Sequence, residues 1–423
     1  MKQIYSIREY GSFLSGREVP GFVSLPPKVF EQLEELLLRS PDGELSDFLT
    51  LSFRRGIGKV LQVRNYAGIL DLDDHTAIEI LPKAVFPQGD PGGVLAKKLL
   101  LEMLRTLPDA PFRKFQTAEL DLATMDLFEI FIRMFLDETA ELARRGLKCS
   151  YVPTEENVRF FRGKLLLSQH LIQNNIHQER SYVCYDDFNA DRPENRLLKS
   201  TLLRLSGQSR SFRNRNDIRQ LLWFFESVHP STNYAADFSR CVSNRNTRAY
   251  DTALGWCRAF LSGKSFTAYS GSSNAAALLF PMETLFESYL ATLLKKILPA
   301  GCFSLSVQDS QFWLFDEPRA FRLRPDLVLT RKSDGAVFVL DTKWKLLSGS
   351  GSQPGISQAD LYQMFVYQKK YAAQSVTLLY PQSETLSSEK ELHFSAADGT
   401  RINACFLDLS ATEKSLRRIV DSL

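Results

Sequence analysis

Two aspartates and one lysine stand where two neighbouring strands are expected to meet. Asp326 lies in a strand-like segment at 321–329, and Asp341 and Lys343 end the apolar run at 336–340. Side chains at positions i and i+2 of a strand share one face, so Asp341 and Lys343 are expected to project together. The apolar run is typical of a buried strand, and a charged side chain at its end costs desolvation free energy, so these residues are expected to have a function.

The register of the expected hairpin brings Asp326 to the same place. A two-residue turn at positions 334–335 sets Asp326 opposite Lys343. A turn one residue earlier sets it opposite Asp341. Directly opposed residues of an antiparallel pair have Cβ atoms roughly 4.5–5.5 Å apart, and diagonal ones about 7–8 Å. Two carboxylates and an ammonium group therefore converge in either register.

Such a group is suited to hydrolysis of a phosphodiester. Mg²⁺ prefers oxygen ligands, binds through one or two carboxylates plus substrate phosphate, and keeps waters that can become the nucleophile. Asp326 and Asp341 are the expected metal ligands. Lys343 could orient or deprotonate the attacking water, or stabilise charge on the phosphate, and the spacing does not choose between these roles. The competing interpretation is a surface hairpin that carries an ion pair.

Two flanking helices supply further candidates. A helix that begins near Pro281 places Glu287 beside its apolar face. A second helix, opened by a capping box at Ser357, places Gln363 and Tyr367 one turn apart on one face. The alternative is a solvated glutamate and two half-buried packing residues.

Composition limits the class of protein but does not identify an activity. A chain of 423 residues exceeds the usual size of one hydrophobic core. The net charge of +3 does not by itself indicate a nucleic-acid binder. The six cysteines form no C-x-x-C pair, which argues against structural zinc. No apolar stretch is long enough to cross a bilayer, so we expect a cytoplasmic protein without a membrane partner.

The elements suggest an α+β protein of three regions: a β-rich domain at 1–110, a helical region at 111–270 and a last domain at 271–423. Their evidence is a hairpin of strands at 60–72 and 76–81, helical patterns at 93–107 and 122–147, a protruding hairpin at 150–167, and a Gly-, Ser- and Ala-rich joint at 262–281.

The last domain resembles the PD-(D/E)xK nuclease superfamily, whose fold is a mixed β-sheet flanked by helices. The residues that match its pattern are Glu287, Asp326, Asp341, Lys343, Gln363 and Tyr367, with aspartate in place of the commoner glutamate. The resemblance implies that Glu287 is a third metal ligand. Further segments narrow the likeness to the McrC family, namely those at 65–68, 78–83, 161–165 and 191–200.

The McrC resemblance implies a Mg²⁺-dependent endonuclease subunit that cuts modified, methylcytosine-containing double-stranded DNA with a McrB-type AAA+ GTPase hexamer. It implies that the N-terminal part of the chain enters the ring's pore. We expect Arg159 and Arg162, in the protruding hairpin, to stimulate GTP hydrolysis. Their alternative is local pairing with Glu155 and Glu156.

We expect no nucleotide bound by this chain, because no complete phosphate loop is found in it. Dimerisation through the nuclease domain stays open. Two other functions compete: a stand-alone PD-(D/E)xK nuclease in DNA repair or mobile-element processing, and a noncatalytic adaptor that activates an AAA+ ring.

Overall fold

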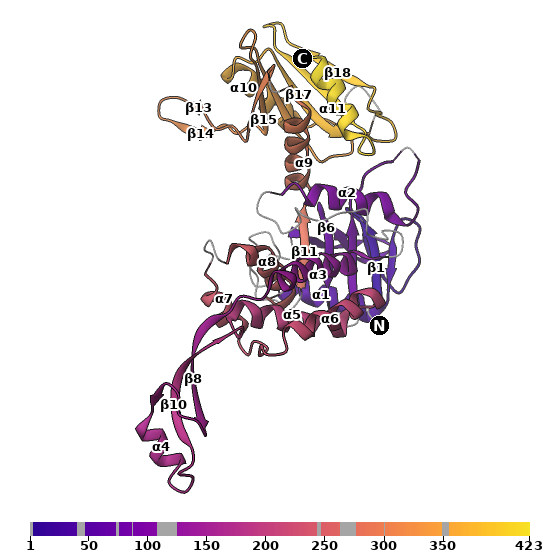
Figure 1. Ribbon diagram of the computed structural model, residues 1–423. Coiled ribbons are helices and arrows are strands. Elements are labelled where there is room, and N and C mark those ends of the chain that lie inside the picture. The colour runs from indigo at the N-terminus through magenta and orange to yellow at the C-terminus, as the bar shows by residue number, and fades with distance from the viewer. Residues whose placement is uncertain are drawn as a thin grey trace. The chain divides into compact units, whose positions relative to one another are not determined.

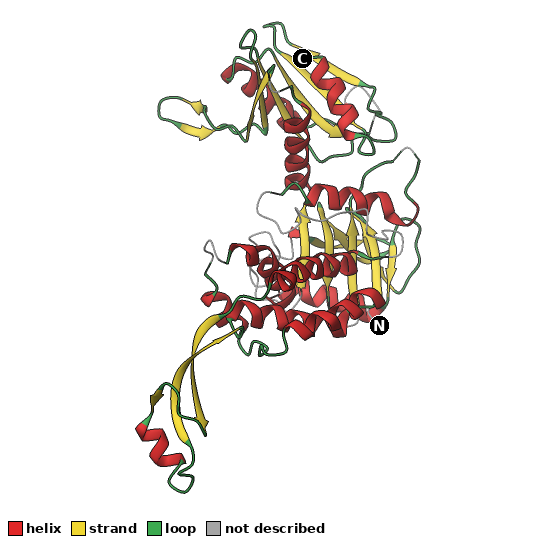
Figure 2. Ribbon diagram, in the orientation of Figure 1, coloured by secondary structure: helices red, strands yellow, loops and turns green. Residues whose placement is uncertain are grey.

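The computed structural model describes residues 3–39, 47–72, 76–86, 88–107, 125–242, 247–262, 276–299, 301–348 and 355–423. The chain divides into two compact units, one of Met1–Lys2 and Phe128–Lys264 and one of Gln3–Leu127 and Ser265–Leu423 (Figures 1 and 2). Helices and sheets occur in both, as expected of an α+β protein. Within these ranges, no helix combines the length and apolar composition that a bilayer span requires.

The N-terminal part of the larger unit is built on two four-stranded sheets. The first has the order β1-β7-β6-β11 and the second β3-β2-β5-β4. The strands are β1 (Gln3–Arg8), β2 (Ser12–Ser15), β3 (Val23–Leu25), β4 (Leu49–Arg54), β5 (Gly58–Val63), β6 (Tyr66–Asp71), β7 (Thr76–Leu81) and β11 (Ala276–Pro281). Helix α1 (Pro27–Arg39) places Phe30 and Leu33 in one core with Phe13 and Leu61 of the strands.

The strand expected over 60–72 is in fact two strands in different sheets. The amide of Tyr66 donates to the carbonyl of Arg64 (2.9 Å), a tight bend that ends β5 and starts β6. β6 then pairs with β7, as predicted, and on its other side with β11. Gly68 permits that second pairing, because a Cβ there would lie 1.9 Å from the carbonyl oxygen of Leu278. The expected turn at 73–75 lies outside the described residues.

A six-stranded mixed sheet forms the C-terminal part of the same unit. Its order is β12-β15-β16-β17-β19-β18, with β16, β17 and β19 parallel and the other neighbours antiparallel. The strands are β12 (Phe303–Val307), β15 (Leu327–Arg331), β16 (Val337–Thr342), β17 (Ser375–Pro381), β18 (Glu391–Ser395) and β19 (Arg401–Leu407). The accompanying helices are α9 (Met282–Ile297), α10 (Gln358–Lys370) and α11 (Thr412–Asp421), whereas α2 (Val94–Leu104) contacts α9 and strand β7 of the N-terminal part.

Helix α10 covers one face of this sheet. Its Met364 and Tyr367 pack in one core with Val339 and Val376. The predicted cap is confirmed, because the Ser357 hydroxyl accepts from the amide of Asp360 (3.1 Å). The strand predicted over 321–329 is wrong in its first half: Ala320–Arg322 is β14, which pairs with β13 (Trp313–Phe315), and β15 begins only at Leu327.

The smaller unit combines helices with a three-stranded sheet, two of whose strands form a long ribbon. Helices are α3 (Leu127–Arg145), α5 (Pro193–Gln208), α6 (Phe212–Phe224), α7 (Tyr234–Arg240) and α8 (Asp251–Ser262). In the ribbon, β8 (Ser150–Val158) pairs along its whole length with β10 (Ser181–Asn189). The hairpin predicted at 150–167 is therefore wrong in its pairing: the partner of β8 is β10, which comes later in the sequence. β9 (Lys164–Leu165) and α4 (Leu167–Gln173) lie between them in the sequence, and we call residues 150–189 the finger (Figure 1).

Candidate active site and the finger

The β15–β16 register places Asp326 beside Asp341. Leu327 pairs with Leu340, so the next position outward sets Asp326 across from Asp341, the second of the two expected registers. Asp326 Oδ2 accepts hydrogen bonds from the amide and the hydroxyl of Thr342, both at 2.7 Å. Thr342 was not predicted, although its place between Asp341 and Lys343 is a signal that it contributes to the site.

Asp341 is a buried carboxylate at the end of an apolar strand. It is 1% exposed, and its Oδ2 forms an ion pair with Lys343 Nζ (2.5 Å). Apart from that ion pair, this oxygen has no hydrogen-bond donor among the described residues. Burial, and next the charge of Asp326, raise the pKa of Asp341 to about 7 in spite of Lys343. Without a bound cation, this carboxyl group is therefore only partly ionised near pH 7.

Helix α10 brings Gln363 and Tyr367 to the lysine. Lys343 Nζ donates to Gln363 Oε1 (3.2 Å), and Gln363 Nε2 donates to the Tyr367 hydroxyl (2.8 Å). Burial lowers the pKa of Lys343, but the charge and the hydrogen bond of Asp341, together with the charges of Asp360 and Asp326, outweigh it and raise the pKa overall. The ammonium group is thus held in its charged form between a carboxylate and an amide.

Glu287 reaches the site from α9 through a residue that was not predicted. Gln308 Nε2 donates to Glu287 Oε1 (2.5 Å), and the Gln308 amide donates to the carbonyl of Asp326 (2.7 Å). Burial and then the charge of Asp326 raise the pKa of Glu287. Asp326 thus acts electrostatically on both Glu287 and Asp341, and hydrogen bonds, an ion pair or charge interactions connect all six predicted residues.

Trp344 ties this site to the N-terminal strands. Its indole Nε1 donates to both carboxylate oxygens of Glu9 (3.1 and 2.9 Å), and its ring centroid lies 5.1 Å from that of Phe286. Burial raises the pKa of Glu9 to about 7. One indole therefore fixes the residues that adjoin Lys343 and Glu287. No sequence pattern indicated this contact.

The donor set fits a cation that keeps water ligands. The described residues hold no group of three or more His, Cys, Asp or Glu side chains already arranged around a metal position. Two adjacent carboxylates, one with a buried oxygen that has Lys343 as its partner among the described residues, are however what Mg²⁺ uses when most of its shell is water and phosphate. An ammonium group beside them can hold a phosphate or a water.

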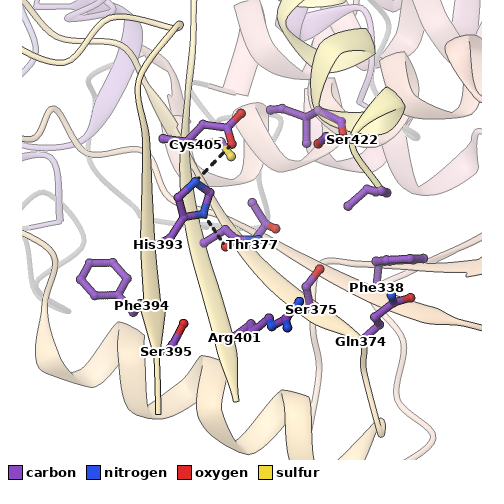
Figure 3. A pocket seen from close by; sticks show the side chains of 14 residues that line it. Phe338, Gln374, Ser375, Thr377, His393, Phe394, Ser395, Arg401, Cys405 and Ser422 are labelled. Carbon is purple, nitrogen blue, oxygen red and sulfur yellow. Dashed lines mark hydrogen bonds and ion pairs between the residues drawn. The ribbon is translucent and has the colours of Figure 1, made fainter. Parts of the chain in front are cut away.

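A cavity of about 340 Å³ lies on the other face of the same sheet (Figure 3). Phe338, Thr377 and Cys405 line it, and these positions alternate with the core residues under α10. His393 Nδ1 contacts Asn403 Oδ1 at 3.0 Å on its rim. None of the predicted site residues lines this cavity, so its size does not mark the candidate site.

The finger is held together by polar contacts near its tip. Asn174 is 4% exposed and exchanges side-chain hydrogen bonds with Asn157 (2.8 and 2.9 Å). Arg162 lies over the Tyr185 ring (3.5 Å to the centroid) and forms an ion pair with Glu156 (3.5 Å). The Arg159 side chain is exposed. The predicted alternative of local pairing thus holds in part for Arg162.

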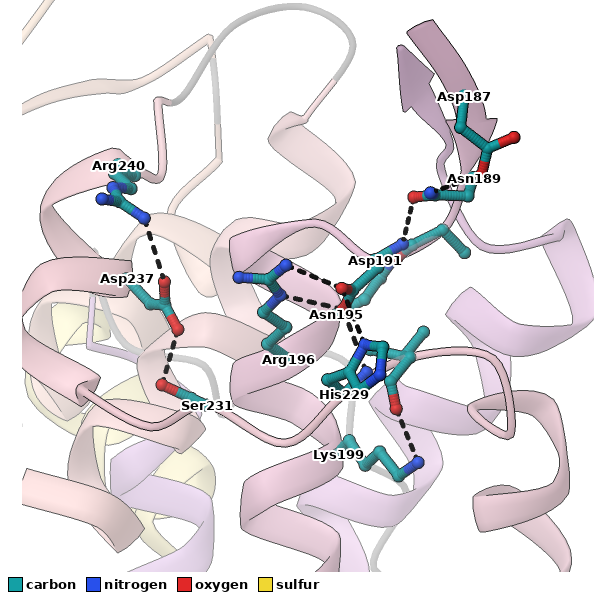
Figure 4. A network of polar contacts seen from close by, with 12 residues as sticks. Asp187, Asn189, Asp191, Asn195, Arg196, Lys199, His229, Ser231, Asp237 and Arg240 are labelled. Atoms are coloured by element: carbon teal, nitrogen blue, oxygen red, sulfur yellow. Dashed lines mark hydrogen bonds and ion pairs between the residues drawn. The ribbon is translucent and has the colours of Figure 1, made fainter. Parts of the chain in front are cut away.

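The segment at 191–200 anchors the base of the finger (Figure 4). Asp191 accepts two hydrogen bonds from Arg196 (2.8 and 2.7 Å), and its Oδ2 lies 2.9 Å from His229 Nδ1. Asn195 Nδ2 donates to the carbonyls of Lys148 and Ala190, which precede β8 and follow β10. These contacts fix where the ribbon leaves the helices.

Replacing Asp341 with Asn should stabilise the metal-free chain at pH 8. Because the folded pKa is raised above the unfolded value of 3.8 to about 7, the wild type loses stability as pH rises between these values. Chemical denaturation should therefore show Asp341→Asn about 1–3 kcal/mol more stable at pH 8 and nearly equal at pH 4. Asp334→Asn is the opposite-sign control, since Arg331 lowers the pKa of Asp334 to about 2. Equal curves for Asp341→Asn and wild type would contradict the burial argument.

Replacing Asp191 with Ala should loosen the finger base. At pH 7 this removes the carboxylate from Arg196 and leaves a partly buried guanidinium unpaired, which costs about 1–3 kcal/mol. Hydrogen exchange should be faster in the amides of β8 and β10 nearest the helices. Asp186→Ala, an exposed aspartate on the same ribbon, should change neither quantity. Unchanged exchange in Asp191→Ala would exclude an anchoring role.

Comparison with known proteins places the chain in a family. The family model described as McrBC 5-methylcytosine restriction system component matches residues 61–381. No curated protein matches. A chain of the Thermococcus gammatolerans assembly of McrB AAA+ hexamers with bound McrC is similar in fold, with a TM-score of 0.69 and 20% identity over 99% of this chain and 100% of that chain.

A chain of the Thermococcus gammatolerans McrBC complex is similar with a TM-score of 0.46 and 19% identity, over 70% of this chain and 88% of that chain. The family match alone extends over well more than half of the sequence, from β5 to the end of β17. The chain therefore belongs to the McrBC family of 5-methylcytosine restriction system components.

Proposed function

We propose that this chain is the Mg²⁺-dependent DNA endonuclease subunit of a McrBC-type restriction complex. The observation that carries the proposal is the cluster of Asp326, Asp341 and Lys343 at the end of β15 and β16, in a mixed sheet flanked by helices as in the PD-(D/E)xK nucleases. Membership of a restriction-system family supports it.

In this proposal each side chain has a distinct role. Asp326, Asp341 and Glu287 hold the metal ion, which when bound lowers the pKa of a water and neutralises phosphate charge. Lys343 moves from Asp341 toward the scissile phosphate or the attacking water. Gln363 and Tyr367 keep the lysine in reach, because Gln363 accepts from Nζ and donates to the tyrosine. The indole of Trp344, held by Glu9, limits the freedom of the strand end.

We further propose a McrB-type AAA+ GTPase ring as the partner. The likeness in fold to a chain of the Thermococcus gammatolerans assembly of McrB hexamers with bound McrC supports this partner. The finger is the element that best fits a pore. Its tip exposes Phe160 (87%) and Ile176 (88%), apolar surface that a partner would cover.

Alanine at Asp341 or Lys343 should abolish DNA cleavage. Each removes a group that acts at the reacting phosphate, so the rate should fall at least about 100-fold. The assay is cleavage of methylcytosine-containing plasmid by the chain with its GTPase partner, GTP and Mg²⁺. Glu287→Ala and Gln363→Ala should be milder, at about tenfold.

The matched control is Asp334→Ala, an exposed acid at the other end of the same hairpin, which should cleave like wild type. Retained cleavage by Asp341→Ala would refute the assigned site. Full-rate cleavage by the chain and Mg²⁺ alone would instead favour a stand-alone nuclease. Failure of every variant and of the wild type to cut, with GTPase stimulation intact, would favour the adaptor.

Arg159→Ala should reduce stimulation of the partner's GTPase more than Arg162→Ala. An arginine can stabilise charge on the transferring phosphoryl oxygens, but Arg162 is already fixed by Tyr185 and Glu156. Steady-state GTP hydrolysis is titrated with wild type, both single variants and the double variant, with binding measured in parallel. The double variant should bind the ring and stimulate at least about tenfold less. Full stimulation by the double variant would exclude both arginines.

A further inference from the structure

A small hairpin lies next to the candidate site, between β12 and the start of β15. β13 and β14 pair through Trp313 with Arg322 and Phe315 with Ala320, and together they connect β12 to β15. Gln308, at the root, donates its amide to the carbonyl of Asp326 (2.7 Å). Figure 1 shows this hairpin extending away from the six-stranded sheet of its unit. We call residues 312–322 the aromatic hairpin.

The root of the aromatic hairpin is fixed on α10. The ring of Phe312 lies 4.7 Å from that of Tyr371 in an edge-on contact, and Lys370 Nζ pairs with Asp316 Oδ2 (2.8 Å). The amide of Leu323 donates to the carbonyl of Phe312 (2.9 Å) and closes the base. Since α10 also carries Gln363, the same helix orients both the hairpin and the lysine of the site.

The tip presents two phenylalanine rings to solvent. Phe315 is 53% exposed and Phe321 is 72% exposed. Because Ala320 pairs with Phe315, a regular strand would turn Phe321 to the opposite face. Its φ is instead +57°, in the left-handed region that bulky residues avoid, and its ring lies edge-on to Phe315 with centroids 6.1 Å apart. Backbone strain is here combined with two rings that contribute little to a core, a combination typical of a binding surface.

The aromatic hairpin and its root also carry cations. Arg319 is exposed at the turn, Arg322 lies 5.5 Å from the centre of the Trp313 ring, and Arg324 donates to Gln308 next to Glu287. The two acids of the turn are Asp316 and Glu317, and Lys370 already neutralises the first. The hairpin therefore joins an apolar tip to a positive flank that leads to the candidate site.

We propose that the aromatic hairpin binds duplex DNA beside the scissile phosphate, with Phe315 and Phe321 as an apolar wedge against a base step and the arginines on flanking phosphates. Apolar wedges from protein loops partly unstack base steps, and arginine supplies the phosphate contacts that orient the duplex. The assignment rests on the proposed function, because DNA must occupy the neighbouring site. A protein partner fits less well, since the positive flank continues into a site built for phosphate.

The test is duplex binding by the whole chain in EDTA, where no cleavage occurs. Fluorescence anisotropy of a labelled duplex of about 30 base pairs is measured between 50 and 200 mM salt, with permanganate oxidation of unstacked thymines as the second readout. Phe315→Ala/Phe321→Ala should lower affinity about tenfold without changing the salt dependence, and should remove the permanganate signal. Arg319→Ala should reduce the slope of log K against log salt by about one.

Phe53→Ala is the matched control, because Phe53 is 78% exposed on β4 of the same unit. Its affinity and permanganate pattern should equal those of wild type. Wild-type affinity in the double phenylalanine variant, or no duplex binding by the wild type at 50 mM salt, overturns the proposal. The proposal is also overturned if the double phenylalanine variant binds the duplex normally and is impaired only in assembly with the GTPase, which would assign the surface to a protein partner. Failure of the proposed function is recognised separately, as retained cleavage by Asp341→Ala.

Discussion

The burial of one carboxylate at the end of β16 determines how the rest of the candidate site is arranged. Asp341 is 1% exposed and loses solvation that Lys343 alone does not replace, so its pKa rises to about 7. Such a group is unfavourable unless a further cation or a proton joins it. The neighbouring contacts can be understood from this constraint, since the Thr342 hydrogen bonds hold Asp326 at the same strand end. Placing charge there lowers the folding stability of the metal-free chain.

Other contacts connect the candidate site to distant parts of the chain. Trp344 follows Lys343 directly and is anchored by Glu9, which is 335 residues away in the sequence. The indole also packs on Phe286. Motion of the N-terminal strands relative to α9 would therefore displace the neighbours of both Lys343 and Glu287. In the smaller unit, the Asp191 and Asn195 contacts give the finger a defined base.

Much of the site was predictable because its signals are local. The apolar run before Asp341 gave β16, and the serine cap gave the start of α10. The elements that were not predicted depend on contacts between distant parts of the chain or on single backbone torsions. Periodicity did not show that Ala320–Arg322 forms its own hairpin, where Phe321 has a positive φ, nor that β11 completes the N-terminal sheet through Gly68. The register was left open because turn length alone decides it. Glu9 and Gln308 carry no motif, so only the folded chain reveals them.

We propose that Asp341, together with Asp326, binds a divalent cation. The most direct measurement is isothermal titration calorimetry of Mg²⁺ binding to the isolated chain at pH 7, in buffers with different ionisation enthalpies. Since Asp341 has a pKa of about 7 without metal, binding should release about half a proton in the wild type and none in Asp341→Asn, which should also bind more weakly. Equal affinity and equal proton release in the two proteins would show that the metal binds elsewhere and would contradict this account.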